Sequence, residues 1–202
     1  MKQIVKHSVV IVTLAALSSC SFMSPVKVPP DTGYVINTVP THIKKSRRHS
    51  ATLLVMKPET NPAYDTTRMA FTLHPYQVSY YSSSRWIETP AEMLAPLLAK
   101  TMEKTGRFKS IITPPFSGRY DYALRSQIKL LQIDYARSKP VMQLDLQVQL
   151  ISASSNSVIA SREFKASVPL RQASPYSAVI AANQANEIVM AKVAAWTVNK
   201  TR

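Results

Sequence analysis

The side chains that most often carry chemistry are sparse in this chain and lack the spacings that enzymes use. Its 202 residues include one cysteine, four histidines and three glycines. One thiol cannot close a disulfide within the chain, and the histidines show no HxxxH or HExxH spacing that would favour zinc. A GxSxG serine motif and a glycine-rich phosphate loop are also missing. With 11 scattered acidic residues, the sequence predicts no enzyme, no metal site and no cofactor.

The cysteine, Cys20, directly follows a segment that is typical of export signals. Two early lysines precede the nine apolar residues 9–17, a run that fits a signal peptide and is too short to span a bilayer. The sequence L-S-S-C at 17–20 resembles the lipobox of bacterial lipoproteins. That resemblance implies a signal peptide over residues 1–19 and acyl chains on Cys20, and more than one chain is needed for stable anchoring. The alternatives are an incidental cysteine after an ordinary signal peptide, or a buried free thiol. Ser21, in place of Asp, suggests transfer to the outer membrane.

Basic residues far outnumber acidic ones. The 25 Lys and Arg against 11 Asp and Glu give a net charge of +14, which should draw the protein to polyanions. An exported protein meets no cellular DNA, so we expect anionic lipid, lipopolysaccharide or an acidic protein surface as partner, and no nucleic acid. The basic cluster at residues 43–49 is interpreted either as a solvated linker or as a contact with lipid phosphates, made by Lys44, Lys45, Arg47 and Arg48.

The mature chain begins with a tether and continues in short strands. Residues 21–32 contain three prolines and no periodic pattern, which is typical of a linker. Strands are expected near 33–37 and over 50–56, 68–74, 76–81 and 108–113. Residues 58–67 should be a loop. The serines at 82–84 are interpreted as a polar loop in preference to a catalytic cluster with His74.

Three longer segments predict an antiparallel meander. Apolar and polar residues alternate over 120–135, with a shift of phase near Leu131 that indicates a β-bulge. Residues 142–150 alternate cleanly, so one face should be buried and the other solvated. A turn at 154–157 then leads into a third strand over 158–169.

Two helices carry clear boundary signals. Thr89-Pro90-Ala91-Glu92 combines a capping box with proline at the first helical position, and Gly106 is the expected stop. Pro96 lies inside this helix and should kink it. The second helix is expected from Pro175 to Lys200, with an apolar stripe of Val179, Ala182, Ala185, Val189, Val193 and Trp196. Together these elements predict a single α/β (α+β) domain, a mainly antiparallel sheet packed by helices 90–105 and 175–200. The domain is expected over residues 50–202, or from near residue 33, with residues 20–49 as lipidated cysteine and tether.

The segment from Asp65 to Phe108 carries a family resemblance. Its D-T-x-R-M, R-W, P-x-x-M-L-x-P-x-L and G-x-F motifs resemble the auxiliary lipoprotein of ABC-type transport systems, the PqiC-like family. The resemblance implies a non-catalytic lipoprotein on the outer membrane, facing the periplasm. Its implied partners are an ABC permease, its ATPase and an MCE-domain protein, which together move phospholipid or related lipids between the two membranes. Pro96 belongs to this family pattern.

Arg85 and Trp86 are the candidate partner-binding pair, with Tyr80 and Tyr81 beside them. An Arg–Trp pair can stack and anchor a partner. The alternative is that Trp86 fills a core pocket while Arg85 makes a local salt bridge. From the family resemblance we expect a docking lipoprotein that captures the MCE protein. The rival hypothesis is a lipoprotein that itself binds lipid or lipopolysaccharide as a carrier or assembly factor. The transported lipid and any homo-oligomer are left open.

Overall fold

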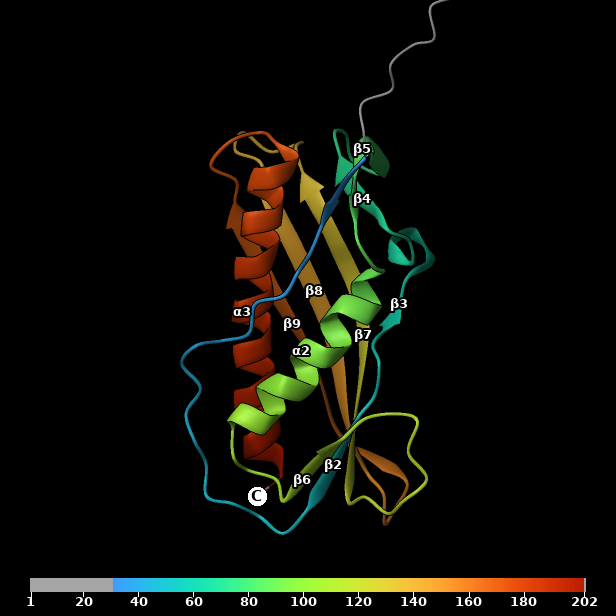
Figure 1. Ribbon diagram of the computed structural model, residues 1–202, viewed down its shortest axis with the longest axis vertical. Helices are drawn as coiled ribbons and strands as arrows, with labels where there is room; N and C mark the ends of the chain where they lie inside the picture. The colour runs from blue at the N-terminus through green and yellow to red at the C-terminus, as the bar shows by residue number, and fades with distance from the viewer. Residues whose placement is uncertain (1–30, 202) are drawn as a thin grey trace, which may run out of the picture. The chain divides into compact units, whose positions relative to one another are not determined.

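In the described part of the chain, residues 31–201, nine strands form one curled, mixed sheet and two helices cover one of its faces (Figure 1). This arrangement, seen in a computed structural model, confirms the expected α+β fold. Asp31–Arg202 form one compact unit. The predicted signal peptide and Cys20 lie outside the described residues.

The long antiparallel meander is confirmed and forms the backbone of the sheet. Strand β7 (Tyr122–Asp134) pairs with β8 (Val141–Ser152), and β8 pairs with β9 (Ser157–Pro169). The register of β7 against β8 shifts between Ile128 and Leu130, so the predicted bulge is present. In β8 the even-numbered residues 142–150 are fully buried and the odd-numbered ones half-buried, as the alternation predicts.

Short parallel strands complete the sheet along the other edge of β7. Strands β2 (Thr52–Val55), β3 (Glu59–Thr60) and β4 (Arg68–Thr72) follow one another along this edge, each parallel to β7. The remaining strands pair with these or with each other, and they are β1 (Thr32–Tyr34), β5 (Ser79–Trp86) and β6 (Ser110–Ile112).

Both helices begin and end close to the predicted residues. Helix α2 (Pro90–Lys104) starts where Thr89 donates to Glu92 Oε2 through its backbone N at 3.3 Å and its Oγ1 at 2.9 Å. It continues through Pro96, and Gly106 follows it with φ of +62°, the left-handed conformation that favours glycine at this position. Helix α3 (Pro175–Lys200) is capped by Ser174, whose side chain accepts from the backbone N of Ser177. Neither of these helices has the length and apolar character that a membrane span needs.

Residues 31–49, expected to belong to the tether, are packed on the domain instead. The Asn183 side chain on α3 donates to the carbonyl of Val35 and accepts from the backbone N of Asn37 and Thr38, all at 3.0–3.2 Å. Ile36 is only 1% exposed and joins the core. Residues 35–38 are therefore part of the folded domain. An asparagine on a distant helix, which the sequence did not flag, holds this segment.

Two other local expectations were wrong. The serines at 82–84 lie within strand β5 and not in a loop. The predicted loop 58–67 contains strand β3 and a single 3₁₀ turn over Pro62–Tyr64. Both segments are short and polar, so their structure depends on pairing with neighbouring strands and not on local pattern.

The domain has two distinct ends (Figure 1). The first, which we call the tether end, carries Asp31, the β4–β5 turn at 73–78, the β7–β8 turn at 135–140 and the start of α3. The opposite end carries the ends of both helices, the segment 41–49, β2 and β6.

Candidate functional site

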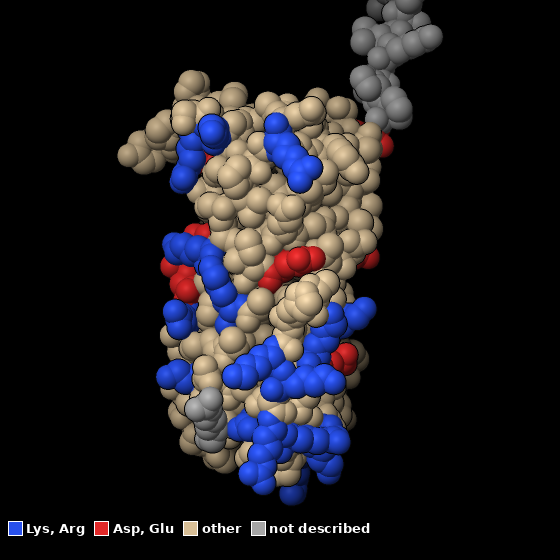
Figure 2. Space-filling view, turned by 90° about the vertical axis from the view of Figure 1, so that its left-hand side faces the viewer, with Lys and Arg blue, Asp and Glu red and all other residues tan. Residues whose placement is uncertain are grey.

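Exposed basic residues gather at one end of the domain. We call it the basic end, and it lies opposite the tether end. Figure 2 shows this concentration of blue side chains on one face, with little red among them. The basic end is formed by segment 41–49, the last turns of α2 and α3, and the start of β6. Its exposed basic residues include Lys44, Lys45, Arg47, Arg48, Lys104, Lys109 and Lys200.

The basic segment is held by backbone hydrogen bonds and by one buried arginine. Ser46 N donates to the carbonyl of Thr105 at 2.9 Å, and His49 N donates to that of Arg107 at 2.6 Å. Arg107 as a whole is 8% exposed. Its guanidinium donates to the carbonyl of Arg47 at 3.1 Å and to that of Thr201 at the end of α3. A cation at this position complements the negative end of the helix dipole. Segment 44–48 is therefore a fixed surface of the domain.

The charges of this end are not neutralised by acidic side chains within the described residues. None of the seven exposed basic residues forms an ion pair with a described Asp or Glu. The ion pairs that do form involve Arg85, Arg125, Arg137 and Lys165 on other parts of the domain. Uncompensated positive charge attracts an anionic partner and raises its rate of encounter.

A pocket of about 360 Å³ opens beside the lysines. Segment 42–46 forms one wall, and the other wall is the C-terminal half of α3, with Ala191, Ala194, Ala195 and Val198. Its volume is near the lower limit of small-molecule pockets, about 300–1,000 Å³. The lining is mixed, because the apolar side chains of α3 lie beside Lys44, Lys45 and the polar residues Thr105 and Asn199.

The candidate pair Arg85 and Trp86 is separated by the sheet. Neighbouring residues of a strand point to opposite faces, and accordingly Trp86 is 2% exposed in the core while Arg85 is half exposed and ion-paired with Asp31. No stacked pair forms for a partner to contact. The indole is closed off by core packing, as in the alternative interpretation.

Tyr80 and Tyr81, beside that pair, make contacts that stabilise the sheet. Tyr80 donates to the carbonyl of Ala63 at 2.9 Å, and the Arg68 guanidinium lies 4.0 Å from the centre of its ring. Tyr81 shares a short hydroxyl–hydroxyl hydrogen bond with Tyr135, and its ring packs on Phe71 with centroids 4.9 Å apart. These contacts join β4, β5 and the end of β7.

Two tyrosines of this region have raised pKa values. Burial, with the Tyr135 hydrogen bond, raises the pKa of Tyr81 well above its usual range. Burial also raises the pKa of Tyr64 to about 12. Both phenols are thus neutral at physiological pH, and neither can act as a general base. Among residues 31–201, no group of three or more His, Cys, Asp or Glu side chains is placed to hold a metal ion.

Comparison with known proteins places the chain in a family. Residues 34–194 match the model of the family described as ABC-type transport auxiliary lipoprotein component. No protein of the curated set that was searched matches the chain.

Solved structures show the same fold. A Xanthomonas campestris protein of the family DUF330 is 25% identical, with a TM-score of 0.76 over 84% of this chain and 96% of its own. A hypothetical protein of Chlamydia trachomatis is 9% identical, with a TM-score of 0.53 over 75% of this chain and 98% of its own. The second likeness concerns the fold alone.

Proposed function

The chain belongs to the family of ABC-type transport auxiliary lipoprotein components, and from this membership we propose that it is a docking lipoprotein without catalytic activity. Acyl chains on Cys20 hold it to the periplasmic face of the outer membrane. The folded domain then captures the MCE-domain protein of the same transport system, which works with an ABC permease and its ATPase. Lipid moves through that conduit and not through this domain.

The observation that carries this proposal is the basic end. Lys44, Lys45 and their neighbours form a fixed, exposed and uncompensated positive surface at the end of the domain that lies away from Asp31. In the sequence these residues were expected to meet lipid phosphates or to be a solvated linker. Their position at the far end favours an acidic protein surface instead, with the neighbouring pocket accepting an apolar side chain.

A charge-reversal experiment tests the docking surface. We expect Lys44→Glu combined with Lys45→Glu to reduce co-purification of the MCE-domain protein from crosslinked cells. Neither lysine side chain makes a hydrogen bond or ion pair within residues 31–201, so the fold should be retained. Lys129→Glu with Arg162→Glu is the matched control, because both residues are exposed midway along strands β7 and β9, away from either end of the domain. Equal capture by the two double variants would refute this docking surface.

The anchor is tested separately. Cys20→Ala should move the protein out of the outer-membrane fraction, because no acyl chain can then be attached. Unchanged fractionation would refute the lipid anchor, and an intact thiol on the native protein in mass spectrometry would do the same.

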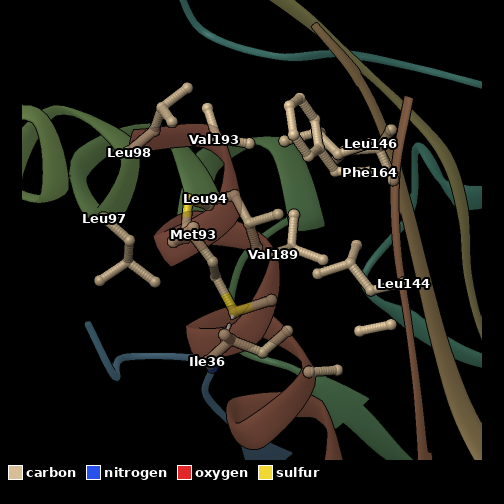
Figure 3. Close-up of a cluster of buried hydrophobic side chains, with 14 of the residues drawn as sticks. Ile36, Met93, Leu94, Leu97, Leu98, Leu144, Leu146, Phe164, Val189 and Val193 are labelled. Carbon is tan, nitrogen blue, oxygen red and sulfur yellow. Dashed lines mark hydrogen bonds between the residues drawn. The ribbon is translucent and has the colours of Figure 1, made fainter. Parts of the chain in front are cut away.

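The carrier hypothesis is less well supported by the packing. Figure 3 shows side chains of α2, α3 and the sheet converging in the space where a lipid would have to lie, and this space is filled by core residues such as Leu94, Leu144 and Val189. Purification of the domain with bound lipid and without the MCE protein would favour the carrier.

A further inference from the structure

The tether end exposes apolar and aromatic side chains next to basic ones. In the β4–β5 turn, Tyr76 is fully exposed, and Leu73 and Val78 are 48% and 42% exposed. Tyr176 in the first turn of α3 is 64% exposed. Lys139 and Arg171 are exposed in the neighbouring turns. Tyrosine is enriched where proteins meet the headgroup region of a bilayer, and basic residues are attracted to anionic lipid.

Tyr76 is presented in an unusual way. Its φ is +68°, the left-handed region that a bulky residue rarely adopts. Its ring makes no hydrogen bond or ring contact with the described residues. The turn therefore projects an aromatic ring into solvent, although glycine or asparagine would suit the backbone better.

We propose that the tether end rests on the membrane surface, with Tyr76, Leu73, Val78 and Tyr176 at headgroup level and Lys139 and Arg171 against lipid phosphates. The proposal rests on the Cys20 anchor proposed above. It adds that the domain itself contacts the bilayer and takes a defined orientation there.

The position of Asp31 is the reason to choose a membrane over a second copy of the chain or another protein. Asp31 directly precedes β1 at the tether end and is 11 residues after Cys20, and 11 residues span at most about 40 Å. An anchored Cys20 thus keeps this end within a short distance of the bilayer. Weak apolar and ionic contacts become effective at such high local concentration.

The orientation has a consequence for docking. Helix α3 has 26 residues and runs from the tether end to the basic end, about 39 Å at 1.5 Å per residue. A domain resting on its tether end therefore directs Lys44 and Lys45 into the periplasm, where a conduit from the inner membrane would arrive.

Fluorescence quenching by brominated lipids tests the orientation. The lipidated mature chain is reconstituted in vesicles of phosphatidylethanolamine and phosphatidylglycerol that carry bromine on their acyl chains near the headgroup. Trp86 and Trp196 are buried, at 2% and 7% exposure, so an added indole dominates the quenchable signal. We expect strong loss of the added emission in Tyr76→Trp. We expect almost no loss in Phe116→Trp, the control at the opposite end, where Phe116 is 47% exposed.

The remaining outcomes each decide against the proposal in a distinct way. Quenching of the Phe116→Trp variant alone would show that the other end faces the bilayer. Quenching of neither variant, with the protein still co-sedimenting with the vesicles, would show that the domain hangs clear of the membrane while leaving the anchor intact. Failure of the unsubstituted chain to co-sediment would overturn the anchor and this orientation with it.

A second variant tests the contribution of Tyr76 without the anchor. Tyr76→Asn suits the left-handed backbone and should fold normally. When Cys20 is replaced by Ala in both proteins, the Tyr76→Asn variant should bind vesicles more weakly than the protein that keeps Tyr76.

Discussion

Arg107 shows how one side chain can join three distant segments. Arg107 lies in the turn after α2. Its guanidinium donates to the carbonyl of Arg47 in the basic segment and to that of Thr201 at the end of α3. A buried charge is tolerated only where hydrogen bonds and dipoles compensate it. Here the carbonyls at the end of a 26-residue helix supply that compensation.

Replacement of Arg107 should therefore destabilise the fold and loosen the basic segment. We expect Arg107→Ala to lower the free energy of unfolding by about 2–4 kcal/mol, since hydrogen bonds to a charged group are lost and carbonyls are left without a donor. Urea denaturation measures this, and hydrogen exchange at the amides of Ser46 and His49 should speed up. Arg119→Ala, an exposed site at the same end, should change stability by less than about 0.5 kcal/mol. Similar effects of the two substitutions would contradict the role given to Arg107.

At the scale of elements, helix α2 contains a proline that should destabilise the helix. Pro96 lies exposed in the middle of the helix, where it cannot donate a backbone hydrogen bond. The flanking residues Leu94, Leu97 and Leu98 are buried in the core, and this packing maintains the helix across the proline. The predicted kink remains a prediction.

Pro96→Ala should raise the free energy of unfolding by about 1–3 kcal/mol, because it restores a backbone donor and helix propensity. Thermal or urea unfolding measures the change, and Lys100→Ala, exposed in the same helix, serves as the control with little expected effect. If Pro96→Ala lowers the stability, then the core packing depends on a bend at the proline.

At the scale of the whole molecule, the charge is polarised. The full sequence has a net charge of +14. Among the described residues, exposed Lys and Arg gather at the basic end on the face shown in Figure 2, whereas the tether end combines apolar and basic groups. Such a distribution steers an acidic partner toward one end of the domain.

Binding of the MCE-domain partner should consequently weaken with salt. Raising the ionic strength from about 0.1 M to about 1 M shortens the Debye length from about 10 Å to about 3 Å. We expect the association rate constant to fall by at least roughly tenfold over this range, as measured by interferometry with the partner immobilised. The Lys44→Glu/Lys45→Glu variant should show a flatter dependence. A rate constant that is insensitive to salt for both proteins would exclude steering by the basic end.

Local patterns predicted much of the fold correctly. The alternation in β8, the bulge in β7, the capping residues of both helices and the stop at Gly106 all depend on neighbours within a few residues of each other. The same patterns failed for segment 31–49, because its partners Asn183 and Arg107 lie far away in sequence. The same limit applies to the candidate site. The sequence identified the basic residues, but it did not predict that they gather at one end of the domain or that Arg85 and Trp86 point to opposite faces of the sheet.

The sequence by itself determined the two capped helices, the antiparallel meander and the excess of positive charge, because each is recorded in composition or in short-range periodicity. The family was indicated separately, by the resemblance of the motifs between Asp65 and Phe108. Only the tertiary structure decided which surfaces these residues form. It placed Trp86 in the core, held the basic segment against the ends of both helices, and set Asp31 at the opposite end of the domain from Lys44. The reason is that such placements arise from contacts between residues up to 148 positions apart, and local preferences carry no information about those contacts.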